Sequence, residues 1–541
     1  MRPWSLILPL LAMLFGGASA AAEPAQAGQG IYREGLLPSG APLRGRAQNG
    51  VELSGMDAAC ASCHRRSGLG GSEGRNAIRP IAGRLLFSRP EIGGSERERA
   101  LFRVKDPRPP YTLDSLARAL REGVDPGGRA LDPLMPRFAL ADAEVAALAA
   151  YLQGLSLDPA PGVTDSEIHF ATIIAPGVAP SRVQAMRDVL HAFLRDKNSG
   201  TRQESRRKSI GTERMYRVYR KWVLHEWALS GPPESWQEQL AARYRQQPVF
   251  AVLSGIGAGS WRPVHEFCEQ AGIPCVFPNV DYPELAGSGY ATLYFSRGVA
   301  LEAEVLARHL AESGRKERIV QVFRDDAAGR VPARALRAAL QRRGIHEISD
   351  HPVSGEGPVP EKFWSQLLPE TRPGVLVLWL NDEDITQLHG QGKAPPGMEN
   401  IYLSGSLIAR PCRVLLFGSW LDRMRLVYPF ELSERRAQRL SRMNHWLEAR
   451  KIPLIDERIQ SSTYFALTVA GDALSSMGDN FSRDYFIERI EQMTEQSPAS
   501  AVYPRLSLGP GQRFASRGGY VARFPGAGES MLMPVSEWIV P

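Results

Sequence analysis

The segment CASCH, residues Cys60 to His64, places two thiols three positions apart and an imidazole directly after the second thiol. This grouping suits three kinds of chemistry: a redox-active dithiol, a structural zinc site, or covalent attachment of haem. A thioredoxin-type dithiol requires a strand before it and a helix after it, and the upstream NGVELSG predicts only a weak strand. A structural zinc site requires four ligands, and the other cysteines, Cys268, Cys275 and Cys412, lie far along the chain.

The third possibility, haem attachment, uses all three side chains of the motif. The thiols of Cys60 and Cys63 would add to the vinyl groups of the porphyrin. His64, one residue further on, would bind the iron as its proximal ligand. We therefore interpret the motif as the attachment site of one covalent haem c.

Met135 is the candidate for the second iron ligand. It lies in the loop LDPLMPRF, which Pro136 restrains, and the segment after the loop predicts an amphipathic helix whose apolar stripe runs through residues 145–152. A methionine sulfur raises the potential of the iron and leaves it no open coordination position. Met56 is nearer to CASCH in the sequence and remains a rival ligand, on the other side of the motif.

Residues from about 50 to 155 resemble a monohaem class I cytochrome c. The resemblance rests on CASCH, the Gly-rich SGLGGSEG after it, the helical LDSLARALREG, and MPRF with the helix that follows. It implies a small all-α domain, which we place at residues 21–158, with a haem held by Cys60, Cys63, His64 and Met135. The sequence departs from the family at the start: Pro and Gly interrupt GLLPSGAPLRGRAQNGVELSG, where we do not find the usual N-terminal helix.

Residues 1–20 predict a secretory signal peptide. Arg2 supplies the positive charge, SLILPLLAMLF the apolar core, and GGASA a small-residue exit with cleavage after Ala20 or, less favoured, Ala22. The apolar run is much shorter than the ~20 residues of a membrane span, and no later segment approaches that length. We therefore expect a periplasmic protein with no transmembrane segment after signal removal. The formal net charge of +7 does not indicate a nucleic-acid partner, because an exported chain meets no genome.

After the linker LDPAPGVTDSE the pattern changes to short apolar strands that alternate with amphipathic helices. The strands include IHFATII, VFAVLSG, RIVQVFRD and VLVLWLN. This alternation predicts parallel sheets with helices on both faces, arranged as two α/β lobes over residues 166–541.

This second region resembles the type I periplasmic solute-binding proteins of the branched-chain amino acid and amide group. The resemblance rests on VFAVLSGIGAGSWRPVHEFCEQAGIPCVFPNV, YATLYFSRGVALEAEVLARHL and YPRLSLGPGQRFASRGGYVARF. It implies two hinged lobes that close on a small polar solute, such as an amino acid or an amide, bound by loops at strand ends. The corresponding residues are Ser254, Ser260, Trp261, Tyr294 and Ser296 in the first lobe and Asn381 and Ser404 in the second.

Three cysteines remain outside the haem motif. Cys268 and Cys275 flank a short loop, and in an oxidising compartment we expect a disulfide between them. Cys412 is then left over, and we expect it to be buried.

The predicted fold is thus multidomain: a small all-α cytochrome c domain followed by a two-lobe α/β domain of the periplasmic-binding-protein type I class. We expect an exported c-type cytochrome that exchanges electrons with a periplasmic redox partner and carries a solute-binding or sensing domain. Two alternatives stay open: an ABC-transport receptor with an accessory haem, and a haem-linked periplasmic oxidoreductase. We find no nucleophile elbow, zinc-protease motif, phosphate loop or dinucleotide fingerprint in the sequence. The hypothesis that the protein is an enzyme is therefore the less favoured one.

Overall fold

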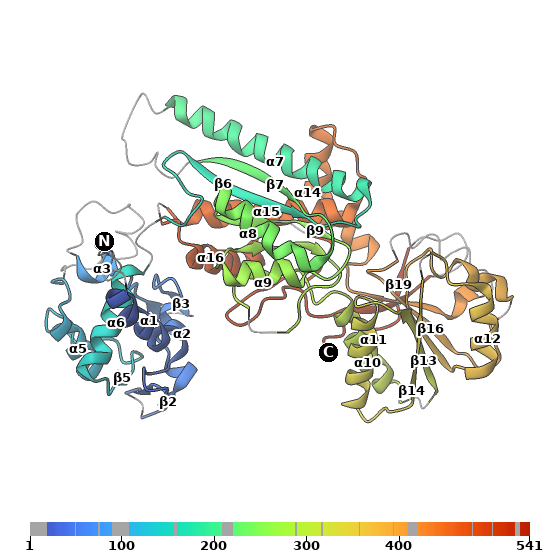
Figure 1. Ribbon diagram of the computed structural model, residues 1–541, viewed down its shortest axis with the longest axis horizontal. Helices are drawn as coiled ribbons and strands as arrows, with labels where there is room; N and C mark the ends of the chain where they lie inside the picture. Colours follow the sequence, from blue (N-terminus) through green and yellow to red (C-terminus); the bar gives the residue numbers. More distant parts are fainter. Residues whose placement is uncertain are drawn as a thin grey trace, which may run out of the picture. The chain divides into compact units, whose positions relative to one another are not determined.

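We describe a computed structural model of the chain (Figure 1). The description covers residues 19–48, 50–73, 76–88, 108–155, 159–207, 220–286, 289–314, 317–355, 357–392, 394–408, 420–478, 480–499, 501–524 and 531–541. The chain divides into a small unit, Met1–Ala160 with Met477–Tyr485, and a large unit, Pro161–Ser476 with Phe486–Pro541. The expected signal peptide up to residue 18 lies outside the described residues, as does Cys412. None of the helices in the described ranges is long and apolar enough to cross a membrane.

The small unit consists mainly of short helices around one apolar core. Its helices are α1 (Ser19–Glu34), η1 (Gly55–Ala58), α2 (Cys60–His64), α3 (Gly83–Phe87), α5 (Leu113–Glu122) and α6 (Asp142–Gly154). Its strands are β1 (Arg44–Arg46), β2 (Glu52–Ser54) and β5 (Arg137–Phe138), in the antiparallel order β2-β1-β5, with a hairpin of β3 (Gly71–Glu73) and β4 (Asn76–Ile78). Helices α1, α5 and α6 supply most of the buried apolar side chains of the core.

Helix α1 corrects the expectation that the N-terminal helix is missing. The helix lies upstream of the Pro- and Gly-rich segment that we searched, and it packs against α6. It is hard to recognise because, from residue 24 on, its buried apolar side chains, Ile31 and Tyr32, come in the last turn. Cleavage after Ala20 would fall within α1 and would leave Pro24 in the first turn of the shortened helix, where its missing N–H is not needed.

Gly28 sets the distance between α1 and α6. A Cβ atom at this position would lie 2.1 Å from the carbonyl oxygen of Ala147, so only glycine permits the observed approach of the two helices. Near this crossing the rings of Tyr32 and Tyr151 pack with their centroids 5.3 Å apart. At the N-terminal end of α6, the Glu144 carboxylate accepts a hydrogen bond from Ala141 N at 2.7 Å, which fixes the start of this helix.

The large unit contains two sheets, and each defines one lobe. The strands of the first sheet are β6 (Glu167–Ile174), β7 (Lys221–Ala228), β8 (Ala251–Leu253), β9 (Ile256–Gly257), β10 (Cys275–Val276), β11 (Asn279–Val280) and β12 (Thr292–Leu293). These strands pair with one another in parallel, and the run β7-β6-β8-β10-β12 has the doubly wound order 2-1-3-4-5. The associated helices are α7 (Pro180–Arg207), α8 (Trp236–Gln246), α9 (Arg262–Gln270), α14 (Ser433–Ala449) and α15 (Glu457–Ser476), with α16 (Arg483–Gln496) later in the chain.

The second sheet repeats this order. Its strands are β14 (Ile348–Val353), β13 (Ile319–Arg324), β15 (Val375–Trp379), β16 (Asn400–Ser404), β17 (Met424–Tyr428), β18 (Tyr520–Arg523) and β19 (Met533–Pro534), listed as they lie across the sheet. The first five are parallel, and β18 and β19 are antiparallel additions. Helices α10 (Val299–Glu312), α11 (Arg330–Gln341) and α12 (Glu361–Thr371) and the 3-10 helix η4 (Thr386–Gln391) accompany this sheet (Figure 1). The predicted two-lobe α/β class is confirmed.

The chain passes between the lobes three times, after β12, after β17 and before β18. Tyr503, from the third of these segments, contacts one aromatic side chain from each of the other two: Phe295 stacks on it and Phe430 packs on it, both with centroids 5.1 Å apart. These three side chains form an aromatic cluster where the chain crosses between the lobes. In the first lobe a disulfide joins Cys268 of α9 to Cys275 of β10, with the two Cα atoms 6.3 Å apart.

Replacing Gly28 with alanine should destabilise the small unit by about 1–3 kcal/mol, because the added methyl group meets the backbone of α6, which cannot move aside alone. Gly30 offers a matched control in the same helix, since a Cβ there would lie 3.5 Å from its nearest neighbour, the Leu36 carbonyl oxygen. Chemical denaturation followed by far-ultraviolet circular dichroism should separate the two. Equal stability of the Gly28→Ala and Gly30→Ala variants would show that the helices do not cross as described.

Candidate haem site and solute cleft

The side chains of the CASCH motif lie on a single helical turn, α2. Both cysteines are free: Cys60 is partly buried against the core of the small unit, and Cys63 is exposed. Burial raises the pKa of the Cys60 thiol to about 12. A redox-active dithiol requires the opposite shift, towards a stable thiolate. The turn therefore presents two unbridged thiols, and the surroundings of Cys60 do not favour the thiolate that a redox dithiol requires.

His64 is held by a hydrogen bond that leaves one ring nitrogen available. Its Nδ1 lies 2.9 Å from the carbonyl oxygen of Arg79, and because a carbonyl only accepts, Nδ1 must carry the proton. Nε2 then keeps its lone pair for a metal. Burial lowers the pKa of the ring and so favours the neutral form that binds metals. This arrangement fits an axial iron ligand.

Met135 lies in a loop with a defined hydrogen-bond pattern. Its N–H donates to the Asp132 carbonyl oxygen at 3.0 Å, and the Asp132 carboxylate accepts from Leu134 N at 2.9 Å. Its side chain is partly buried and packs on the same core as Cys60. The rival Met56, in η1, is 65% exposed. The surroundings of the two methionines therefore favour Met135 as the ligand.

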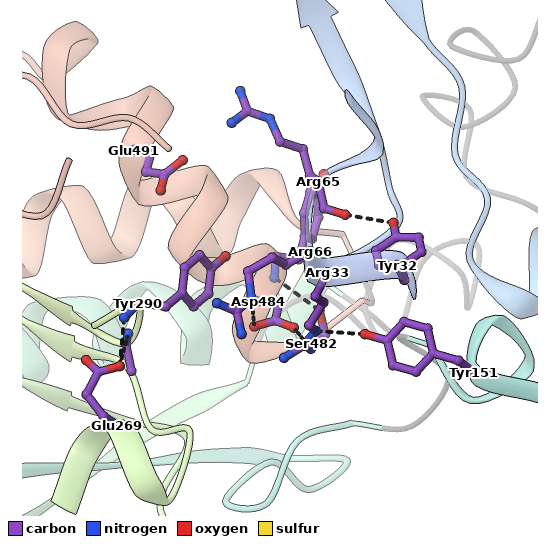
Figure 2. Close-up of polar contacts among 12 residues, drawn as sticks. Tyr32, Arg33, Arg65, Arg66, Tyr151, Glu269, Tyr290, Ser482, Asp484 and Glu491 are labelled. Atoms are coloured by element: carbon purple, nitrogen blue, oxygen red, sulfur yellow. Dashed lines mark hydrogen bonds and ion pairs between the residues drawn. The ribbon is translucent and has the colours of Figure 1, made fainter. Parts of the chain in front are cut away.

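Asp484, a carboxylate far along the chain, belongs to the small unit. Its Oδ2 accepts a hydrogen bond from Arg33 Nη2 at 2.7 Å, and its Oδ1 lies 4.0 Å from Arg66 Nε (Figure 2). The Nε of Arg33 donates to the Tyr151 hydroxyl at 2.8 Å. The side chains of Arg33 and Asp484 are only 22% and 24% exposed. A shared carboxylate thus ties α1, α6 and the loop after α2 together, and no local sequence pattern reveals it.

Of the predicted solute residues, Ser254 and Trp261 lie inside the first lobe. Ser254 is 1% exposed, and its hydroxyl lies 3.3 Å from that of Thr463 and accepts a hydrogen bond from Asn279 Nδ2 at 3.0 Å. Trp261 is also 1% exposed, and its ring covers Gly257. In the described structure both side chains serve the packing of the strand-end loops.

Tyr294 also lies in the first-lobe core. It is 1% exposed, its hydroxyl lies 3.1 Å from His265 Nδ1, and its ring stacks on Phe514 with centroids 5.3 Å apart. Burial raises the pKa of the Tyr294 phenol well above its usual range. Its hydroxyl is therefore already bonded within the protein.

Ser260 and Asn381 are exposed and organise turns. The Ser260 hydroxyl accepts from Arg262 N at 3.4 Å, next to the start of α9. The Asn381 side-chain oxygen accepts from Glu383 N and Asp384 N, both at 2.9 Å. Each side chain lies at a strand end, as expected, and is accessible to a solute.

The remaining two, Ser296 and Ser404, belong to polar clusters that involve residues we did not predict. The Ser296 hydroxyl accepts from Gly298 N at 3.0 Å and is also hydrogen-bonded to the Tyr503 side chain of the aromatic cluster. Ser404, at the end of β16, is hydrogen-bonded to Glu302 of α10. Ser296 therefore links two of the crossing segments, and Ser404 links β16 to α10 within the second lobe.

Glu302 is the buried anchor of the second cluster. It is 1% exposed, and its two oxygens accept from Gly405 N at 2.9 Å and Ser406 N at 3.0 Å. Burial raises the pKa of Glu302 to about 7, although its hydrogen bonds act in the opposite direction. Glu302 therefore fixes the loop after β16 against the first turn of α10.

Asp281 and Arg458 form a second unpredicted element, at the strand ends of the first lobe. Arg458 donates two hydrogen bonds to the Asp281 carboxylate, at 2.7 and 3.1 Å, and the side chains are 19% and 14% exposed. The pKa of the adjacent Tyr282 is raised far above its usual range, first by burial and then by carboxylates from both lobes: Asp281, Asp326, Glu302 and Asp384. Tyr282 therefore lies within electrostatic reach of carboxylates from both lobes, and it follows the end of β11, the kind of strand end at which open α/β sheets bind ligands.

Replacing Glu302 with glutamine should destabilise the large unit by about 1–3 kcal/mol at pH 8, because an NH2 group then faces a backbone N–H donor. In the wild type, the native state retains a proton between pH 4.5 and about 7 that the unfolded state has lost. The stability from this group is therefore present below pH 4.5 and is lost as the pH rises to about 7. The variant should lack this decline.

Tryptophan fluorescence can follow this transition selectively, since every tryptophan except Trp4 lies within residues 161–541. The matched control is Glu312→Gln, at the exposed end of the same helix, where the carboxylate pairs with Arg308 at 2.8 Å. A Glu302→Gln protein with the same pH dependence as the wild type would contradict the raised pKa.

Comparison with known proteins gives matches for both units. The family model described as periplasmic binding protein matches residues 231–528, and the model described as cytochrome c matches residues 47–156. No curated protein matches the chain.

Several solved structures share the fold. A branched-chain amino acid ABC transporter protein from Thermus thermophilus with bound valine is 12% identical, with a TM-score of 0.52 over 70% of this chain and 98% of that one. A fatty acid ABC transporter substrate-binding protein from Thermomonospora curvata is 13% identical, with a TM-score of 0.51 over 71% and 95%. A solute-binding protein from R. palustris in complex with benzoate is 12% identical, with a TM-score of 0.50 over 70% and 98%.

At these identities the structural likeness establishes the fold alone. The match to the periplasmic binding protein model, however, spans more than half of the chain. The chain therefore belongs to the periplasmic binding protein family and carries a cytochrome c domain fused ahead of the solute-binding fold.

Proposed function

We propose that this protein is an exported electron carrier in which one covalent haem is combined with a solute-binding domain. The observation that carries the proposal is the pairing of two unbridged thiols on α2 with His64, whose Nδ1 is bonded to the Arg79 carbonyl oxygen, within a domain that matches cytochrome c. Cys60 and Cys63 would hold the haem through thioethers, and His64 and Met135 would bind its iron. When bound, haem supplies a one-electron couple.

The chain's own residues favour electron transfer over chemistry at the iron. His64 offers Nε2 from one side, and Met135 offers a thioether from a loop that Asp132 and Pro136 restrain. Two protein ligands leave no coordination position for a substrate. The partner on this proposal is a periplasmic redox protein.

The large unit would bind a small polar solute, such as an amino acid or an amide, between its lobes. The support is the position of Tyr282 within electrostatic reach of carboxylates from both lobes and the aromatic cluster of Phe295, Phe430 and Tyr503. The structural relatives carry names that refer to valine, a fatty acid and benzoate, so the fold alone does not select the solute. We propose that the protein acts in the periplasm and that the solute is bound without conversion.

A Cys60→Ala, Cys63→Ala double variant should lose all haem that survives acid–acetone extraction, because no thioether can form. The wild type should retain one haem per chain, with a sharp α band after reduction. Ser62→Ala, on the same helical turn, is the control and should retain the haem. Haem that stays covalently attached in the double variant would refute the assignment.

Met135→Ala should remove the weak near-infrared sulfur-to-iron band of the oxidised protein, allow carbon monoxide to bind after reduction, and lower the redox potential. Met56→Ala should leave all three properties unchanged, because Met56 is exposed. The reverse result, with the band lost only in Met56→Ala, would transfer the ligand role to Met56.

A further inference from the structure

Helix α11 of the second lobe carries a row of arginines. Arg330, Arg334 and Arg337 follow one another at spacings of four and three residues, so they share one face of the helix. The opposite side of the helix is apolar and buried, with Leu336 and Leu340 in the lobe core. The row therefore marks the outer edge of the contact between α11 and the sheet.

A cavity of about 290 Å³ lies between this row and the strands β13 and β14. Its apolar part comes from Phe323, Ala333 and Pro352, one residue from each of the three elements. The lining comes from the second lobe alone, and β14 is the edge strand of that sheet. No first-lobe residue lines the cavity, which distinguishes it from a solute site formed by both lobes.

Two of the arginines are already neutralised. Arg330 donates to the Asp325 carboxylate through Nη2 at 2.5 Å and Nε at 3.1 Å. Arg337 pairs with Asp350 through Nη2 at 2.8 Å and Nε at 3.1 Å. These pairs flank the cavity, and each has a net charge of zero.

Arg334, between the two pairs, is different. It lines the cavity, it is exposed, and it has no hydrogen-bond or ion-pair partner among the residues that the structure describes. The cavity therefore carries one uncompensated positive charge above an apolar surface. A planar guanidinium is well suited to a carboxylate, which it can hold through two parallel hydrogen bonds.

The walls also limit the charge of a ligand. Because the carboxylates of Asp325 and Asp350 are already paired with arginines, the cavity has one positive charge to offer, and a phosphate or a dicarboxylate would bring a second negative charge that no cation there compensates. A single negative charge at Arg334 balances the cavity, and an aliphatic chain can contact Phe323 and Pro352. We propose that this cavity is a second small-molecule site that binds a monocarboxylate with a short aliphatic chain.

The test is a calorimetric titration of the full-length haem protein with butyrate and, separately, with butyramide, which has the same shape and no charge. Butyrate should bind saturably, and butyramide should bind at least tenfold more weakly. Arg334→Gln should weaken butyrate binding about tenfold or more, which corresponds to the loss of one charge-assisted interaction. Arg342→Gln is the control, because Arg342 is exposed just beyond α11 and does not line the cavity.

A soak of crystals with 4-bromobutyrate gives an independent readout. The anomalous signal of bromine should lie beside Phe323 and Pro352, with the carboxylate towards Arg334. The proposal is overturned if butyrate does not bind saturably, if Arg334→Gln binds it as the wild type does, or if the bromine lies elsewhere. Arg334 and Arg342 are not among the residues that we propose for the main solute. A negative result with butyrate would therefore not count against the proposed solute site between the lobes.

Discussion

His64 can act as an iron ligand only if its ring is held in one orientation and one tautomer, and its hydrogen bond to the Arg79 carbonyl oxygen provides both. The rest of the small unit serves to place this pair of groups. Gly70 has φ +68, and a Cβ there would lie 2.2 Å from the Ile78 carbonyl oxygen, so the loop after α2 can fold back only with glycine. The Tyr32 hydroxyl donates to the Arg65 carbonyl oxygen at 2.7 Å and ties α1 to the residue after His64 (Figure 2). The close crossing of α1 and α6 at Gly28 therefore also influences the position of His64.

In the large unit, too, polar side chains hold the surrounding loops in place. The Ser254 hydroxyl, after the end of β8, is bonded to Asn279, and the Glu302 carboxylate of α10 fixes the loop after β16 through two backbone amides. A loop that is held in this way presents its backbone and remaining side chains to a solute without prior ordering, which reduces the entropy lost on binding.

The sequence predicts those features that arise from short-range patterns. CASCH is five consecutive residues, the amphipathic stripe of α6 repeats with the helical period, and the alternation of strands and helices identifies both lobes. Helix α1 was not predicted because Ile31 and Tyr32, its buried apolar side chains from residue 24 on, lie in its last turn. Its start also overlaps the expected signal peptide. The strand-end rule located the loops of Ser254 and Tyr294 but not the direction of their side chains, which point into the core. Arg33 and Asp484 are 451 positions apart, and Asp281 and Arg458 are 177 positions apart. A single sequence contains no signal that predicts such pairs.

On the function proposed above, one molecule holds a permanent haem and an exchangeable solute. Mass spectrometry of the protein isolated from the periplasm tests both parts in a single sample when it is recorded under denaturing and then under native conditions. The denatured mass should equal the polypeptide that begins after the signal peptide plus one haem, and the native mass should exceed it by one small organic molecule that is recovered unchanged. A denatured mass without haem would contradict this function, as would a bound molecule that is released as an oxidised product while the haem becomes reduced.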